Sequence, residues 1–261
     1  MSVITNLIET YNLVYQVEKE YPLEIIVTMD LYHERLKLAN TKCDQAIVKA
    51  SKQELDDSLK LLVLPDLIDP HYYLLLHEDL FDESQQYGQA IAYEYTKVID
   101  YAEIQEKYGV ANLRAAQFPD SACYLFLAEV RAWFRGFNLY YNLISAENKA
   151  VLFSYLCGAV PEYESLLSFD LTNHMQSLAE FYGQALAIGA YVNFDVSLPD
   201  YLTRHHVHDL LKVVHDNINN LSIFENYEAI HAAYEDFVLN QSKIPEPHIH
   251  SHSCNHIHHD H

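Results

Sequence analysis

The chain has 261 residues and a mass of 30.3 kDa, and its 37 acidic against 16 basic side chains give a formal net charge of −21. This charge repels phosphate groups at long range, so we expect neither a nucleic acid nor a membrane surface as a partner. Half of the residues are hydrophobic, but only 6 are glycine and 8 are proline. So many apolar residues can fill a core without a cofactor, and so few turn-forming residues favour long helices.

Apolar residues recur at helical spacing along most of the chain. Local start signals support several helices, among them a capping box from Ser51 to Glu54 and a cap at Asp69 before Pro70. We find no convincing strand, and we predict an all-α protein, a compact bundle of about ten helices. The expected helices cover residues 3–20, 23–49, 52–63, 70–80, 83–108, 120–143, 146–158, 161–168, 171–193, 199–219 and 225–241.

The composition changes after Lys243. Pro245 and Pro247 cannot continue a helix, and each pushes the residue before it toward an extended backbone. We therefore divide the chain into a helical domain, residues 1–243, and a histidine-rich tail, residues 244–261.

One short sequence repeats within the helical domain. Residues 87–92 read YGQAIA and residues 182–187 read YGQALA. A glycine inside a helix is usually tolerated where another helix crosses closely, so two such crossings are the simpler interpretation. The alternative places Gln89 and Gln184 symmetrically around a central pocket.

The cysteines and the N-terminal residues bear on the cellular compartment of the protein. Cys43, Cys123 and Cys157 lie in apolar helical patterns, Cys254 lies in the tail, and no CxxC pair occurs. The first twenty residues have no basic segment followed by an apolar block, and no apolar run approaches the ~20 residues of a membrane helix. We expect a cytoplasmic protein.

The tail carries the strongest chemical signal. Its last fourteen residues read HIHSHSCNHIHHDH, and in an extended chain its even-numbered positions all project to one side. Imidazole with one thiolate suits zinc, nickel, copper or cobalt and suits calcium or magnesium poorly. The predicted metal ligands are His248, His250, His252, Cys254, His256, His258, His259 and His261.

A flexible tail that closes on an ion loses conformational entropy, so affinity is expected to be moderate and selectivity poor. This fits storage, buffering or delivery of a metal better than catalysis. A purification handle would be a homopolymer or a strict repeat, which this tail is not. We expect a metal-binding accessory protein that docks on a protein partner.

A second group of possible ligands lies on the helix expected over residues 199–219, namely His205, His208, Asp209 and His215. The stretch HDLLKVV resembles the His-Asp motif of the HD-domain phosphohydrolases, which are all-helical metal enzymes. The resemblance implies a metal site made by His174, His208, Asp209 and Asp236. Leu210 stands where that family often has a small residue. The alternative interpretation is a polar edge of a surface helix.

Two pairs of an acid and a histidine also have the spacing of one helix face, Asp30 with His33 and Glu228 with His231. In four-helix bundles such pairs, completed by further carboxylates, build dimetal sites. Glu94 and Glu129 lie among apolar residues and could complete the set. Only Glu228 and His231 match the Glu-x-x-His pattern of ferritin-like sites.

The chain has no glycine-rich phosphate loop, no GxSxG and no HExxH, so we expect a binding protein rather than an enzyme. Its 21 tyrosines can cover the edge of a core or form a protein-binding surface. The alternative function is therefore an interaction module, such as an adaptor, a chaperone or a toxin-neutralising protein, whose acidic, tyrosine-rich body binds a basic partner.

Overall fold

The computed structural model describes residues 2–57, 61–65, 71–81, 87–109, 118–143, 145–151, 154, 171–188 and 207–241. Helices make up 72% of the described residues, so the predicted predominance of helix is confirmed. The α-helices are α1 (Ser2–Val14), α2 (Leu31–Lys37), α3 (Lys42–Ala50), α4 (Lys52–Asp57), α5 (Tyr87–Tyr108), α7 (Ser121–Leu143), α9 (Leu171–Ala187), α12 (Val207–Asn217) and α13 (Tyr227–Gln241). A short 3₁₀ helix, η1, covers Glu78–Phe81.

Three segments for which we predicted helix are strands instead. They are β1 (Leu23–Thr28), β2 (Leu61–Pro65) and β3 (Tyr72–His77), and they form one sheet in the order β1-β3-β2. β3 runs parallel to β1 and antiparallel to β2. The predicted helices were therefore wrong at the start of 23–49, at the end of 52–63 and over most of 70–80, where β-branched or buried apolar residues favour a strand.

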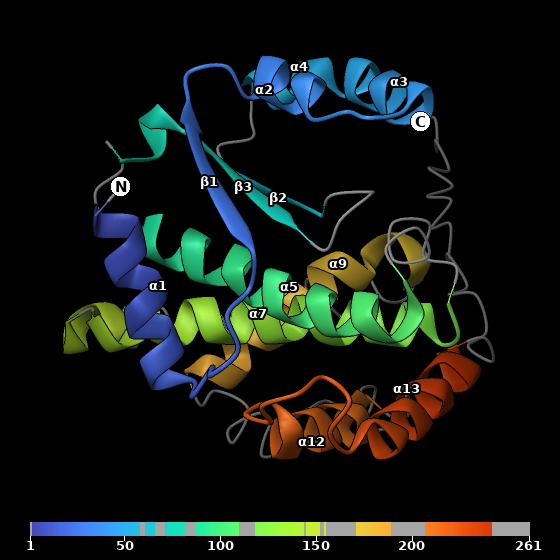
Figure 1. Cartoon of the computed structure of the whole chain (residues 1–261). Helices are drawn as coiled ribbons and strands as arrows, with labels where there is room; N and C mark the ends of the chain where they lie inside the picture. Colours follow the sequence, from blue (N-terminus) through green and yellow to red (C-terminus); the bar gives the residue numbers. More distant parts are fainter. Residues whose placement is uncertain are drawn as a thin grey trace, which may run out of the picture.

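Helices cover both faces of the sheet (Figure 1). Alternate residues of β3 point to opposite faces: Leu74 and Leu76 pack in one cluster with residues of α1 and α5, whereas Leu75 packs with Leu31 of α2. All three leucines have no exposed surface. Because β3 is central and covered on both faces, its sequence is apolar throughout and does not alternate.

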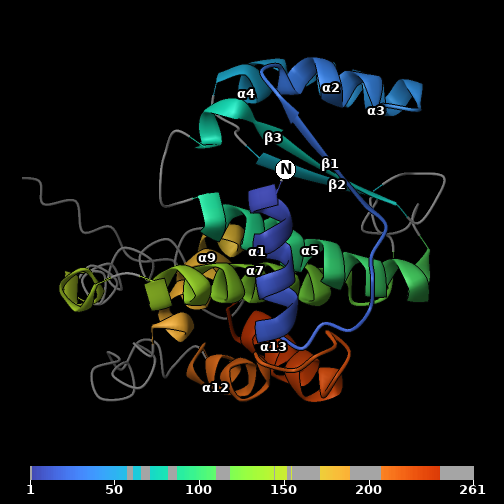
Figure 2. The same ribbon diagram turned by 60° about the vertical axis from the view of Figure 1, so that its left-hand side comes forward.

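The remaining helices form a bundle below the sheet. α5 packs on α7, α7 packs on α9, and α12 pairs with α13. Figures 1 and 2 show α12 and α13 on the side of the molecule opposite to α2, α3 and α4. The largest core cluster joins α7, α9, α12 and α13 through residues such as Phe126, Phe181, Leu210 and Phe237.

Two glycines allow the central helices to approach closely. A Cβ atom on Gly136 would lie 2.8 Å from the carbonyl oxygen of Gln89, and one on Gly183 would lie 2.7 Å from that of Val130. At Gly88 the nearest atom is a side-chain carbon of Leu7, 3.8 Å away. The predicted close crossing is therefore confirmed at Gly183 but not at Gly88, and α5 crosses α7 at Gly136.

Other predictions fall on residues outside the described ranges. These are the helix over 161–168, part of that over 146–158, the N-terminal part of that over 199–219, and the tail. Among the described residues, no helix is both long enough and apolar enough to span a bilayer.

Replacing Gly183 with alanine is expected to lower the free energy of unfolding by about 1–3 kcal/mol, because backbone atoms of α7 must move to admit the methyl group. The matched variant Gly88→Ala has room for its methyl group and should stay within about 1 kcal/mol of the parent. Chemical denaturation of the three proteins measures both values. Equal stabilities of the two variants would contradict the close crossing.

Candidate functional site

A pair of buried arginines organises the site. Arg131 and Arg135 lie one turn apart on α7, and each has only 1% of its surface exposed. Nε of Arg131 donates to the Asp100 carboxylate on α5 at 3.0 Å, and Nη1 of Arg135 donates to the Tyr11 hydroxyl on α1 at 3.1 Å. Burial lowers the pKa of the Arg131 guanidinium, and the Asp100 carboxylate opposes this shift.

Both arginines also bind the turn that connects α12 and α13. The carbonyl oxygen of Asn220 accepts from Arg131 at 3.0 Å and from Arg135 at 2.9 Å. A second anchor follows two residues later, where the Glu103 carboxylate accepts from the Ser222 hydroxyl at 2.6 Å and from the Ile223 amide at 3.1 Å. These bonds hold the α12–α13 turn against α5 and α7.

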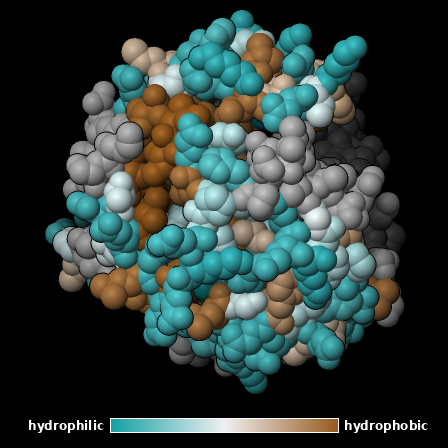
Figure 3. All heavy atoms as spheres, viewed as in Figure 1, coloured by the Kyte–Doolittle hydropathy of each residue, from teal (hydrophilic) through white to brown (hydrophobic). Residues whose placement is uncertain are grey.

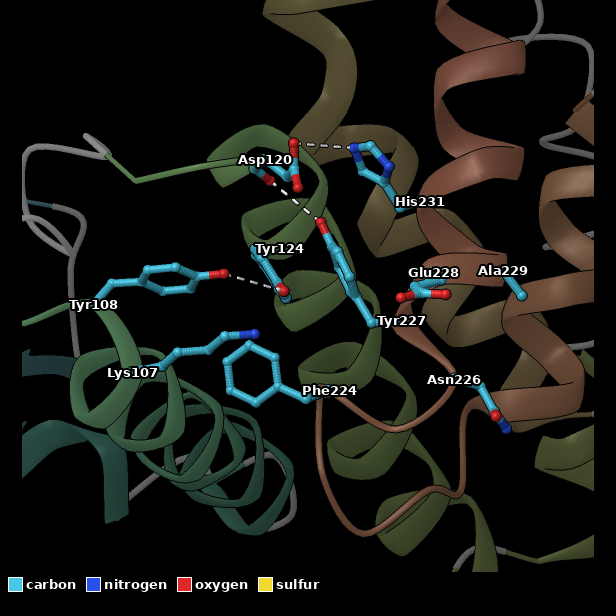
Figure 4. Close-up of a pocket in the computed structure, with 10 residues that line it drawn as sticks. All are labelled: Lys107, Tyr108, Asp120, Tyr124, Phe224, Asn226, Tyr227, Glu228, Ala229 and His231. Atoms are coloured by element: carbon cyan, nitrogen blue, oxygen red, sulfur yellow. Dashed lines mark hydrogen bonds and ion pairs between the residues drawn. The ribbon is translucent and has the colours of Figure 1, made fainter.

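The anchored turn forms one wall of a pocket of about 710 Å³ (Figure 4). The end of α5 and the start of α7 form the other walls. A volume of this size is within the range of small-molecule sites. The lining residues are Lys107, Tyr108, Asp120, Tyr124, Phe224, Asn226, Tyr227, Glu228, Ala229 and His231.

Aromatic rings form the apolar surface of this pocket. The rings of Tyr124 and Tyr227 are stacked with their centroids 3.7 Å apart. The Lys107 ammonium group lies 4.1 Å from the centroid of the Phe224 ring and 5.2 Å from that of Tyr108. This is the geometry of a cation–π contact. Among the described residues Lys107 has no carboxylate partner, so its charge is available to an anionic group.

Burial affects the thiol and two of the phenols at this pocket. Burial raises the pKa of the Cys123 thiol, which interacts with Tyr227, to about 12, and it also raises the pKa of Tyr227 and Tyr124. Nε2 of His231 lies 3.2 Å from the Asp120 carboxylate (Figure 4). The pocket therefore offers apolar rings, hydroxyl groups, one ammonium group, one imidazole and the carboxylates of Asp120 and Glu228, which is binding chemistry without an activated thiolate or phenolate.

The predicted tail ligands, residues 248–261, lie outside the described residues, as does His205. His208 lies in the first turn of α12, where Asp209 is exposed. Nδ1 of His215 lies 3.2 Å from the Asp216 carboxylate. His174 lies on α9 and Asp236, which is exposed, on α13. The HD-type metal site therefore stays a prediction.

The predicted dimetal set is not assembled. Asp30 and His33 belong to the start of α2, where the Asp30 side chain accepts from the His33 amide at 2.7 Å. Glu228 and His231 belong to α13, on the opposite side of the molecule (Figures 1 and 2). The two acid–histidine pairs therefore cannot share an ion.

Glu94 and Glu129 do come together, but around a lysine. Nζ of Lys97 lies 3.9 Å from Glu94 and 3.2 Å from Glu129, and the Tyr93 hydroxyl donates to Glu129. Burial alone would lower the pKa of Lys97, but Glu94, Tyr101 and Glu129 reverse this effect and raise it. A lysine ammonium thus neutralises the carboxylates for which we predicted a metal.

Sequence reasoning missed the arginine pair and the pocket. Arg131 and Arg135 are four residues apart in the apolar stretch AEVRAWFRGF, so the pattern already places them on one helix face directed into the core. A buried arginine needs a carboxylate partner, and this signal could have drawn attention to Asp100. The pocket had no comparable signal, because its walls combine residues 107–124 with residues 224–231, which follow a hundred or more positions later in the sequence.

Among the residues that the structure describes, no group of three or more histidines, cysteines or acids is placed to hold a metal ion. Comparisons with protein-family models, with curated proteins and with solved structures found no match to the chain.

Replacing Asp100 with asparagine leaves the buried Arg131 guanidinium without its counter-charge, and we expect a loss of about 3–5 kcal/mol in the free energy of unfolding. The control is Glu106→Gln, which removes the exposed ion pair with Lys19 and should leave the unfolding midpoint unchanged. Urea denaturation measures both. A small loss for Asp100→Asn would show that the arginine pair does not depend on this charge.

Proposed function

We propose that this protein binds transition-metal ions through residues 244–261 and stores, buffers or delivers them in the cytosol. The observation that carries the proposal is the run of ligands at even positions, His248, His250, His252, Cys254, His256 and His258. His259 and His261 add further imidazoles. Zinc, nickel, copper and cobalt all accept imidazole and thiolate ligands, and at equal supply the Irving–Williams order favours copper.

The cysteine supports a reducing compartment. Cys254 can act as a ligand only as a free thiolate, and thiols stay reduced in the cytosol. Delivery also requires contact with a recipient protein. The net charge of −21 favours a recipient with a basic surface, which it would attract at long range.

The test compares the full chain, without any added handle, with a version that ends at Lys243. Each is loaded with Zn²⁺, dialysed and analysed for bound metal. We expect the full chain to retain zinc and the shortened chain to retain none, because all the proposed ligands have been removed. Retention should fall as the pH drops below about 6.5, where protons compete for imidazole nitrogens. Stoichiometric zinc in the shortened chain would contradict the proposal and direct attention to the helix histidines.

A matched pair of cysteine variants tests the thiolate. In the Co²⁺-loaded full chain, Cys254→Ser is expected to abolish the sulfur-to-cobalt charge-transfer absorption, because a serine hydroxyl is not a thiolate ligand. The control Cys43→Ser changes an exposed cysteine of α3 and should leave the absorption intact. A spectrum that neither variant changes would exclude Cys254 from the proposed site.

A further inference from the structure

The outer edge of β1 has no partner strand among the described residues. β1 is the end strand of the sheet, and the Tyr72 amide of β3 donates to the Pro22 carbonyl at 2.8 Å. Because backbone groups alternate in direction along a strand, the N–H and C=O groups of Leu23, Ile25 and Val27 point to the open side. Such an edge is a template for another strand.

Apolar side chains lie along this edge. Figure 3 shows a continuous hydrophobic area on the face that β1 crosses in Figure 1. Val27 is 42% exposed, Met29 directly after the strand is 71% exposed, and Ile25 and Ile26 are half-buried. Soluble proteins usually protect an edge strand with lysine, proline or a bulge, and residues 23–28 contain neither lysine nor proline. A contiguous exposed apolar area of this kind marks an interaction site.

The charges around the edge are acidic. Glu18 and Glu20 precede β1, Glu24 lies within it and Asp30 follows it, and all four are exposed. The only basic residue between positions 18 and 30 is Lys19, whose ammonium group is paired with Glu106 at 2.7 Å. A second copy of the chain would bring two such acidic sets together, whereas a basic partner would neutralise them.

The two faces of β1 specify a pattern in the partner. Leu23 and Ile25 lie on the face that packs with α1 and α5, and Glu24 lies on the opposite face. A strand added beside β1 places its own alternate side chains next to these residues on the same faces. Apolar residues would then adjoin Leu23, Ile25 and Val27, and a basic residue would adjoin Glu24, whose carboxylate also lies 3.8 Å from Nε2 of His71.

We propose that β1 is a docking edge for an extended segment of another protein, in which apolar and basic residues alternate and which adds to the sheet as a fourth strand. Main-chain hydrogen bonds to Leu23, Ile25 and Val27 supply affinity, and the alternation supplies specificity. This site does not involve the metal-binding tail and is independent of the metal proposal.

The test uses a fluorescent peptide of sequence Val-Lys-Val-Lys-Val-Lys-Val and the full chain in the presence of a chelator. Fluorescence anisotropy is expected to show saturable binding that weakens as salt rises, and NMR should show the largest amide shifts at residues 23–28. Two control peptides separate the contribution of main-chain hydrogen bonds from that of charge. N-methylation at alternate residues removes the donors of one edge, and replacement of lysine by glutamate reverses the charge; each should weaken binding by about tenfold or more.

A matched pair of protein variants locates the site. Val27→Lys places a charge on the exposed edge and should weaken binding by about tenfold or more. Leu239→Lys introduces the same charge at an exposed position of α13, on the other side of the molecule, and should leave binding unchanged. Thermal unfolding checks that both variants remain folded, and the N-methylated peptide tests the edge without any change to the protein.

Three outcomes would overturn the proposal. Absence of binding at about 1 mM peptide in low salt would remove the edge as a docking site. Equal binding of the N-methylated peptide would show that charge alone, and not main-chain hydrogen bonding to β1, attracts the peptide. Concentration-dependent dimerisation that Val27→Lys abolishes would assign the edge to a second copy of the chain. Because the chelator removes tail-bound metal, none of these results bears on the metal proposal.

Discussion

The buried arginine pair on α7 is the interaction on which the arrangement of the helices depends. A guanidinium group remains charged in a protein interior, so Arg131 and Arg135 require oxygen atoms from the elements packed against them. Asp100 of α5, Tyr11 of α1 and the Asn220 carbonyl of the α12–α13 turn supply them. The C-terminal helices therefore dock where those oxygens meet the arginines. This docking creates the aromatic pocket and fixes the direction of α13, the last described helix before the proposed metal-binding tail.

The sequence predicted the long helices well and the sheet not at all. α5, α7 and α13 span several turns, so their apolar periodicity is unambiguous and their ends lie close to those expected. β2 and β3 have only 5 and 6 residues, and an apolar run of that length fits a buried helix equally well. In β1 the β-branched series Ile25, Ile26, Val27 and Thr28 did favour a strand, but a strand needs partners, and those were found only in the folded chain.

The same limit applies to the site. Glu94 and Glu129 do lie together, as the predicted metal site required, but the sequence could not show that Lys97 would occupy the space between them. Spacing also could not separate Asp30 and Glu228, because i, i+3 patterns describe one helix and not the distance between two helices. The tail is different, because its proposed ligands are close together in the sequence itself. The chain need not fold to bring them to one ion. Composition and spacing alone can therefore support the proposal of metal binding.

The measurement that tests this account most directly is X-ray absorption at the zinc edge of the full chain loaded with one equivalent of Zn²⁺. Binding by the tail predicts a first coordination shell of imidazole nitrogens at about 2.0–2.1 Å with one sulfur at about 2.3 Å, and the multiple scattering typical of imidazole rings. A shell of oxygen atoms alone would contradict it, because the exposed carboxylates of the acidic body, and not the histidines and Cys254, would then hold the ion.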